Sequence, residues 1–387
     1  MALLITTGGI NSNAQTYTAN EANEFAIDLY KKISTESSEN IFFSPLSISM
    51  ALGMTYAGAQ GETKVEMSNV LNFPLEDKPL HALFGKLQSE LMGQESKGVE
   101  ISIANQLWAD AHYRFKWRYL CNVRKFYNAP VKRMKFRSQP NECRLEINKW
   151  VEDKTNDRIV DLLPEGSISD MTALVLTNAI YFKGKWADEF EAEYTEEAVF
   201  KTLNGETVTC QMMNKQDKYH LYQGNNIKLL ELPYQGNSFS MLVLLPDEGI
   251  SISQIEKELT LDRLNHHISI MTQSDVRVSL PKFKFDSEYE LKPILADMGM
   301  PIPFSNKADF TRMSSKPDLK IDEVFHKAFV EVSEEGTEAA AATAVVIVRK
   351  SVSIPVDFVA NRPFMFFIRH NESENILFMG RVTNPNK

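Results

Sequence analysis

Side chains that commonly carry out catalysis occur in this sequence, but not in arrangements typical of an active site. The 387 residues include seven histidines and three cysteines. They contain no Gly-rich phosphate loop, GxSxG elbow or HExxH helix, each of which would hold a phosphate, nucleophile or metal in a fixed geometry. His266 and His267 are adjacent, so they point in different directions and make a poor ligand pair. The pattern therefore predicts neither an enzyme nor a metal site.

One segment, residues 334–353, carries contradictory local signals. It reads EEGTEAAAATAVVIVRKSVS, so strong helix formers run directly into the β-branched stretch Val345 to Val348. Such a conflict is expected at a functional or switching site. One interpretation is an Ala-rich helix that runs into a buried strand. The other is an exposed loop that can become a strand inside a sheet.

The second interpretation makes demands on side chains that this segment meets. A strand that inserts between two others needs small or hydroxyl side chains where it enters, alternation to suit two faces, and no proline. Gly336 gives the chain freedom to pivot. Counting by twos beyond it gives one face that begins with small or hydroxyl residues, namely Thr337, Ala339, Ala341 and Thr343.

The elements that must position this segment are mixed helices and largely antiparallel strands, which indicates an α+β fold. Helices are expected at Ala19–Ile33, Ser47–Ala57 and Glu62–Leu71. Strands are expected at Val99–Ala109, Leu174–Phe182, Ile227–Leu232, Phe239–Leu245 and Val276–Phe285, with a hairpin of Ala360–Arg369 and Asn375–Val382. No linker rich in Gly, Ser or Pro divides the chain, so we expect one domain over residues 1–387.

The charge is acidic overall but unevenly distributed. There are 42 basic and 51 acidic residues, a net charge of −9, which argues against bulk attraction to nucleic acid or a membrane. Residues 112–141 contain no Asp or Glu and nine basic residues, which we call the basic strip: Arg114, Lys116, Arg118, Arg124, Lys125, Lys132, Arg133, Lys135 and Arg137. A solvated face is one interpretation, and a site for a polyanion is the other.

Several motifs, in order, resemble the serpin family over nearly the whole chain. They are Asn40–Ser49 (NIFFSPLSIS), Leu176–Trp186 (LTNAIYFKGKW), His326–Ala328, Asn361–Phe364 and Phe378–Val382. The resemblance implies a serpin fold with three β-sheets, eight to nine helices and an exposed reactive-centre loop at about residues 334–358. It also implies a monomer that inhibits a serine protease as a suicide substrate: the cleaved loop inserts into the large sheet before the acyl-enzyme is hydrolysed.

The resemblance assigns roles to individual residues. Four match the polar shutter cluster beneath the large sheet: Ser44, Ser47, Asn178 and His326. Three match the breach at the top of that sheet: Trp186, and Lys282 paired with Glu334. Ordinary core polar groups, a core aromatic and a solvated surface pair are the alternative interpretations.

The loop resembles that of inhibitory members, because residues 336–343 carry no proline or bulky side chain. Counting fourteen residues from Gly336 puts Lys350 at the primary specificity position with Ser351 after it, and Arg349 is the alternative. A long cation suits a trypsin-like protease. Residues 344–347 are similar to the loop of antithrombin, whereas residues 348–350 depart from it. A non-inhibitory carrier, storage or chaperone serpin is the alternative function.

The remaining expectations concern partners and compartment. No cofactor is required, and a heparin-like or other glycosaminoglycan bound by the basic strip is a candidate activator; neither nucleic acid nor a membrane is an expected partner. Cys121, Cys143 and Cys210 show no metal-type spacing and imply no disulfide framework. The sequon at Asn371 is a candidate glycosylation site and favours secretion, with the cytoplasm as the alternative.

Overall fold

The computed structural model describes residues 17–92, 98–337 and 354–387, which form nine α-helices, two short 3-10 helices and fifteen strands. The helices are α1 (Ala19–Glu36), α2 (Pro45–Tyr56), α3 (Gly61–Leu71), α4 (Asp77–Met92), α5 (Trp117–Tyr127), α6 (Pro140–Lys154), α7 (Ile252–Glu258), α8 (Leu261–Ser269) and α9 (Leu291–Asp297), with η2 (Ala192–Tyr194) and η3 (Ile302–Phe304). This mixture of helices and strands confirms the predicted α+β class.

The strands form two hydrogen-bonded sheets. The six-stranded sheet has the order β10 (Phe283–Glu290), β11 (Glu323–Ser333), β12 (Gly336–Thr337), β4 (Leu174–Lys185), β2 (Val99–Asp110) and β3 (Lys132–Met134). The nine-stranded sheet has the order β1 (Ile41–Phe43), β15 (Ile376–Val382), β14 (Phe364–His370), β8 (Phe239–Pro246), β7 (Ile227–Pro233), β6 (Thr207–Gly224), β9 (Thr272–Pro281) and β13 (Val356–Val359), with β5 (Glu196–Lys201) on β6.

Three sheets were expected, and two of them are joined by hydrogen bonds into the nine-stranded sheet. The 18-residue strand β6 causes this, because its first part pairs with β5 and β9 while its last part pairs with β7. The expected hairpin is present as the antiparallel pair of β14 and β15. The segment Val276–Phe285, expected as one strand, is two strands in different sheets, because the chain leaves one sheet after Pro281 and enters the other at Phe283.

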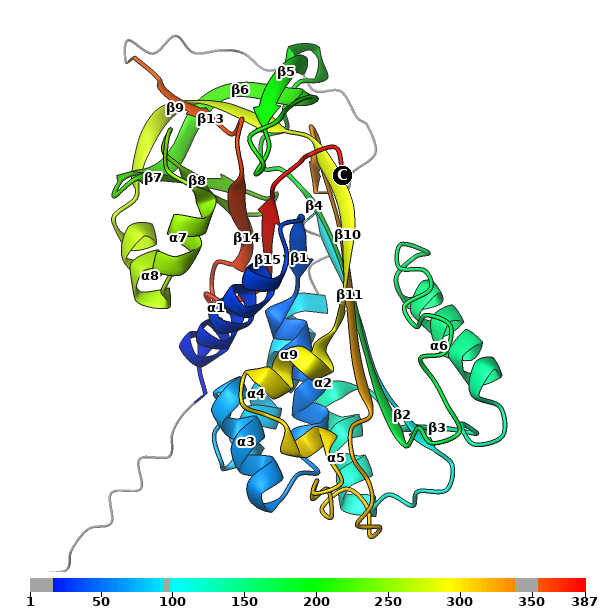
Figure 1. Ribbon diagram of the computed structural model, residues 1–387. Helices are drawn as coiled ribbons and strands as arrows, with labels where there is room; N and C mark the ends of the chain where they lie inside the picture. The colour runs from blue at the N-terminus through cyan, green and yellow to red at the C-terminus, as the bar shows by residue number, and fades with distance from the viewer. Residues whose placement is uncertain (1–16, 93–97, 338–353) are drawn as a thin grey trace, which may run out of the picture.

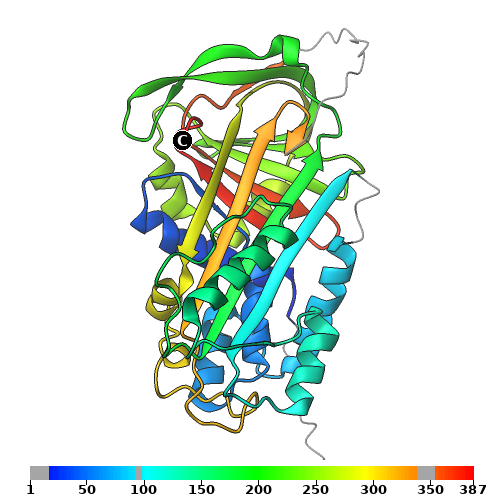
Figure 2. The ribbon, with the colours of Figure 1, turned by 90° about the vertical axis from the view of Figure 1, so that its right-hand side faces the viewer.

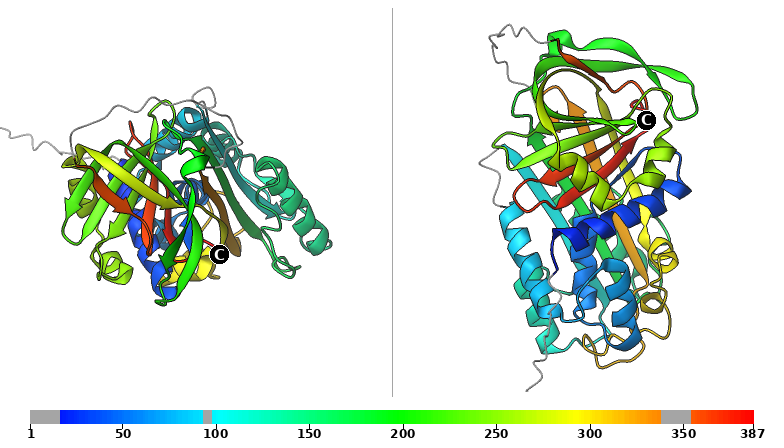
Figure 3. Two further views of the ribbon diagram at one scale, coloured as in Figure 1. Left: turned by 90° about the horizontal axis from the view of Figure 1, so that it is seen from above. Right: turned by 90° about the vertical axis from the view of Figure 1, so that its left-hand side faces the viewer.

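The six-stranded sheet lies between two layers. Helix α6 crosses one face of its long strands (Figure 2). Helix α2 and the end of the nine-stranded sheet formed by β1, β14 and β15 lie on the other face (Figure 1). Helices α7 and α8 lie outside β7 and β8, beside α1 (Figure 3). The central strand β4 is thus covered on both faces, and ten of its twelve residues are buried.

Helix α2 lies in the interior of the molecule, and the sequence at its N-terminus is favourable for starting a helix. The Ser44 hydroxyl accepts a hydrogen bond from the backbone N–H of Ser47, and Pro45 occupies the first helical position, where its missing N–H costs nothing. Every residue of α2 is buried, because its sequence is apolar or small on all sides. This helix therefore presents its N-terminal serines to the underside of the six-stranded sheet.

Candidate functional site

Strands β4 and β11 lie side by side at the middle of the six-stranded sheet, and their contact has two parts. From Glu323 with Val175 to Phe329 with Tyr181 they pair directly as parallel strands. Beyond that ladder β12 (Gly336–Thr337) lies between them and pairs antiparallel with both. The segment that follows β11 has thus already entered the sheet at the end where β4 and β11 finish, which we call the top.

The residues of β12 suit this narrow position. Gly336 has a φ of 154°, and a Cβ there would overlap the carbonyl oxygen of Gly184 on β4, so only glycine fits without a shift. Thr337 is 1% exposed, and its hydroxyl lies 2.7 Å from the buried Tyr234 hydroxyl. A polar side chain is therefore tolerated at full burial because it has a hydrogen-bond partner.

Aromatic rings form the wall beside this hydrogen bond. The ring of Trp186 stacks on Tyr234 with centroids 4.8 Å apart and an interplanar angle of 10°. The indole N–H of Trp186 donates to the carbonyl oxygen of Ser333 over 3.0 Å. The backbone N–H of Trp186 donates to the carbonyl oxygen of Glu335. The predicted breach tryptophan therefore holds the chain on both sides of the turn between β11 and β12.

The predicted ion pair at the breach is also present as a contact. The Lys282 Nζ lies 2.8 Å from Oε2 of Glu334, and the other carboxylate oxygen, Oε1, accepts a hydrogen bond from the Thr195 hydroxyl over 2.9 Å. Partial burial would raise the pKa of Glu334, but hydrogen bonds from Lys282 and Thr195 hold it below its ordinary value. The carboxylate thus stays ionised at neutral pH and fixes the start of the turn.

The predicted shutter residues meet below the top, at the direct ladder of β4 and β11. The Asn178 side chain donates to the Ser47 hydroxyl over 2.6 Å and accepts from Nδ1 of His326. The backbone N–H of Ser44 donates to Nε2 of His326 over 3.1 Å. Asn105 on β2 accepts from both Asn178 and Ser47. All four predicted residues are fully or almost fully buried, and they connect α2 to three strands.

These contacts determine the charge state of His326. Because its Nε2 accepts a hydrogen bond, the ring carries its proton on Nδ1 and is neutral. Burial lowers the pKa of His326 to about 3. A second proton would add a buried charge and would face the Ser44 N–H, so the network holds together only with neutral histidine.

No sequence pattern identified three residues of this region: Tyr234, Asn105 and Thr195. Tyr234 follows the expected strand Ile227–Leu232, and nothing in its neighbourhood indicates a partner 103 positions away. The alternation of the strand containing Asn105 was the available signal, but alternation gives a face and not a partner.

Other predicted loop residues cannot be placed. Ala339, Ala341, Thr343, Arg349, Lys350 and Ser351 lie outside the described residues, so the hinge beyond Thr337 and the reactive bond stay predictions. The chain is described again from Ile354, which is 93% exposed, and it continues into β13 at the edge of the nine-stranded sheet.

The structure divides the basic strip into two parts. In the second part, Lys132 lies 2.9 Å from the carboxylate of Glu146, and Arg137 lies 3.5 Å from that of Asp110. Arg133 donates to a backbone carbonyl, while Lys135 is exposed. The first part is exposed and shows no ion pair with the described residues; it consists of Arg114, Lys116, Arg118, Arg124 and Lys125. A glycosaminoglycan site stays a prediction.

The remaining expectations concern glycosylation, metal binding and a membrane-spanning segment. The Asn371 side-chain nitrogen donates to the carbonyl oxygen of Asn237 over 2.9 Å, so glycosylation would replace that contact; the site and secretion stay predictions. Within residues 17–92, 98–337 and 354–387, no group of three His, Cys, Asp or Glu side chains could hold a metal ion. No helix in this part of the chain is both long and apolar enough to cross a membrane.

Comparisons with known proteins agree with this geometry. The family model described as serpin (serine protease inhibitor) matches residues 20–385. Leukocyte elastase inhibitor of Xenopus tropicalis is 41% identical over 369 residues, which cover 93% of this chain and 97% of that protein. Serpin B4 of Homo sapiens is 40% identical over 386 residues, covering 94% and 99%. Human thyroxine-binding globulin, solved with thyroxine, matches with a TM-score of 0.87 and 29% identity, covering 95% and 98%.

Proposed function

The chain belongs to the serpin family, and from that premise we propose that it inhibits a serine protease as a suicide substrate. The observation that carries the proposal is the position of β12 between β4 and β11. Because the loop begins inside the sheet, the rest of it can follow as a strand between β4 and β11. Relatives named as elastase inhibitors support inhibition as the activity.

The proposed reaction uses the catalysis of the target. The protease serine attacks the carbonyl carbon of Lys350, the bond to the Ser351 nitrogen breaks, and that nitrogen leaves as a new N-terminus. An ester then joins the protease to Lys350. The freed segment 338–350 inserts below Thr337, and at about 3.3 Å per residue its 13 residues carry the protease roughly 40 Å. Water then fails to hydrolyse the ester because the protease is displaced before deacylation.

Sheet pairing supplies the direction of this movement. The strand that continues β12 would separate the parallel ladder of β4 and β11 and replace it with two antiparallel ladders. Antiparallel pairing is slightly more stable per residue than parallel pairing, and every inserted residue gains partners on two sides. The shutter network lies on the ladder that must separate, so it opposes insertion until the loop is cut.

The target class follows from the scissile bond. Cleavage after Lys350, or after Arg349, requires a protease with an acidic specificity pocket, which is trypsin-like. Relatives named leukocyte elastase inhibitor favour a second candidate, since elastase has a small apolar pocket. Val348 and Ile347 are the residues that such an enzyme would select. The position of cleavage therefore distinguishes the two targets.

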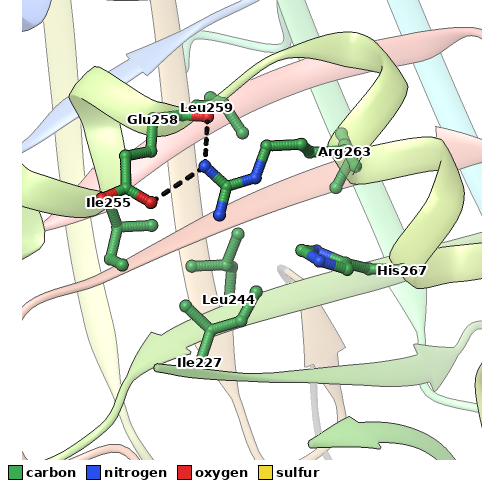
Figure 4. Close-up of a pocket in the computed structure, with 8 residues that line it drawn as sticks. Ile227, Leu244, Ile255, Glu258, Leu259, Arg263 and His267 are labelled. Atoms are coloured by element: carbon green, nitrogen blue, oxygen red, sulfur yellow. Dashed lines mark hydrogen bonds and ion pairs between the residues drawn. The ribbon is translucent and has the colours of Figure 1, made fainter. Parts of the chain in front are cut away.

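A carrier function is the alternative from another class, because one similar structure binds thyroxine. A pocket between α7, α8 and strands β7 and β8 has the apolar lining that a hormone would need (Figure 4). Its cavity of about 20 Å³ holds about one water molecule. Across its mouth the Arg263 guanidinium is paired with the Glu258 carboxylate at 2.9 Å. This pocket gives the carrier alternative little support.

The test is to incubate the protein with trypsin and, separately, with elastase. We expect a complex with trypsin that survives denaturing electrophoresis, and a released peptide that begins at Ser351. Lys350→Ala should slow complex formation with trypsin at least tenfold because the cation that fills the pocket is lost. Arg349→Ala is the matched control and should change the rate little.

The outcomes separate the alternatives. A peptide beginning at Lys350 moves the bond to Arg349, and one beginning at Val348 or Arg349 supports an elastase-like target. Cleavage by both enzymes without a stable complex, and without a rise in the thermal midpoint, would refute inhibition by insertion.

A further inference from the structure

Helix α5 carries exposed apolar side chains along one flank, beside the face that packs on the protein. Its inner face is anchored by Tyr119, Val123 and Tyr127, which are all buried. Next to this inner face, Leu120 follows Tyr127 in the helical projection and is 37% exposed, and Trp117, further round, is 74% exposed. At 100° per residue, Trp117, Leu120 and the exposed Cys121 fall on one side of the helix. Two large apolar side chains therefore face solvent together.

Cations surround this apolar group. Arg124 lies between Trp117 and Leu120 in the helical projection, and Arg118 and Lys125 lie on the other side of Trp117. All three are exposed and show no ion pair with the described residues. On helix α4, which packs against α5, Lys86 and Glu90 pair with each other at 3.4 Å. The α5 face is thus cationic and apolar at the same place.

This combination is a local exception to the rest of the protein. The basic strip holds nine of the 42 basic residues and none of the 51 acidic ones, so the remainder of the chain is strongly acidic. In the part of the strip on β3 and after it, Lys132 and Arg137 are paired with Glu146 and Asp110, and Arg133 binds a backbone carbonyl. Unpaired cations gather instead beside the most exposed tryptophan of the molecule.

The apolar group decides between two anionic partners. A sulfated polysaccharide would neutralise Arg118, Arg124 and Lys125 but would leave Trp117 and Leu120 in water. An anionic bilayer satisfies both parts of the face, because lipid phosphates and carboxylates pair with cations while the indole ring enters the interfacial layer. We propose that the α5 face docks the protein onto anionic lipid surfaces. This revises the expectation from net charge, which averages over the face and hides it.

The location of α5 is compatible with protease inhibition. Figure 1 shows α5 at the bottom of the molecule, whereas β5 and β13 lie at the other end, beyond the top of the six-stranded sheet. A protein lying on a membrane through α5 would therefore keep the top of that sheet facing water. The helix extends about 16 Å, so it would lie in the headgroup layer and would not span the bilayer.

Tryptophan fluorescence provides a direct test on the full chain. Of the four tryptophans, Trp117 is exposed, while Trp108 and Trp186 are buried and Trp150 is partly buried. We expect vesicles of phosphatidylcholine with 30% phosphatidylserine to shift the emission to the blue and to sediment the protein. Pure phosphatidylcholine should do neither, and 0.5 M salt should release the protein because charge attraction is screened.

Matched variants identify the surface. The triple variant R118Q/R124Q/K125Q should weaken vesicle binding at least tenfold, since each cation near an anionic surface contributes about a factor of five. The triple variant K201Q/K257Q/K307Q makes the same change in net charge on other faces and should bind as the parent does. Trp117→Ala should remove the blue shift and weaken binding at least threefold, whereas Tyr194→Ala, at another exposed aromatic, should not.

Three results would overturn the proposal. The first is an absence of vesicle binding at low salt. The second is equal loss in the two triple variants, which would indicate nonspecific charge attraction. The third is binding of heparin without a blue shift together with no vesicle binding, which would assign the face to a polysaccharide. Trypsin complex formation by the α5 variants should equal that of the parent, so failure here is distinct from failure of the inhibitory function.

Discussion

At the top of the six-stranded sheet, β4 and β11 are separated by Gly336 and Thr337, whereas at its centre they pair directly over the shutter cluster. The top is closed around a side-chain hydrogen bond and stacked aromatic rings. The centre is closed by a buried polar network that connects α2 to both strands. The difference indicates how one sheet can begin to accept a strand and still resist accepting all of it.

The largest expected effect comes from blocking entry at the top. Thr337→Arg would place an unpaired cation where threonine is 1% exposed, and burying such a charge costs several kcal/mol. The loop should then be cut by trypsin without insertion, so that denaturing gels show cleaved chain and at least a hundredfold less complex. Thr337→Ser keeps the hydroxyl and is the control. An undiminished complex with the arginine variant would contradict entry at this position.

The next effect comes from the centre. Asn178→Ala leaves His326 Nδ1 without its partner at full burial and removes the donor to the Ser47 hydroxyl, which should reduce the free energy of unfolding by about 3 kcal/mol. Urea unfolding measures the loss. Asn306→Ala, at an exposed asparagine, should be nearly neutral. A loss of less than 1 kcal/mol at Asn178 would show that the network contributes little to closing the sheet.

Acid should weaken the centre at a higher pH than the top, because the Glu334 carboxylate, whose pKa lies below its ordinary value, keeps its pair with Lys282 until the pH is lower. The pKa of His326 is about 3 in the folded protein, below its ordinary value near 6.5, so the unfolded chain takes up this proton first as the pH falls. Stability is therefore retained above pH 6.5 and lost below it, by about 2 kcal/mol at pH 5. Buried His81, with a pKa of about 4, acts in the same direction.

The measurement is urea unfolding at pH 7.5 and pH 5. In His326→Gln the difference between the two pH values should shrink by about 2 kcal/mol, whereas in the exposed control His112→Gln it should stay as in the parent. An unchanged pH dependence in His326→Gln would show that this histidine is not the group being protonated.

The smallest effect should come from weakening the closure at the top. Tyr234→Phe removes the 2.7 Å hydrogen bond to Thr337 and keeps the ring that stacks on Trp186, a loss of about 1 kcal/mol. Amide hydrogen exchange of Gly336 and Thr337 should accelerate about fivefold, while exchange along the direct ladder of β4 and β11 stays unchanged. Tyr194→Phe is the control. Equal acceleration in both regions would show that they open as one unit.

Much of this region could be anticipated from local sequence. Strand β4 was expected from the apolar run Leu174–Phe182. The observed strand begins at the same residue and ends at Lys185 instead of Phe182. The small residues after Gly336 indicated a segment able to enter a sheet, because alternation and side-chain size are local properties. The roles of Asn178 and His326 came from family resemblance, since no pattern around either residue indicates a partner 148 positions away.

The sequence by itself determined the α+β class, several of the long strands and the C-terminal hairpin, a hinge without bulky residues and a strip of nine cations. Only the tertiary structure decided that Tyr234 closes over Thr337, that the segment Val276–Phe285 serves two sheets, and that Lys132 and Arg137 are paired while the α5 cations are not. The reason is physical. Propensity and periodicity act between near neighbours, whereas strand register and ion pairing depend on which distant residues the packed core brings together.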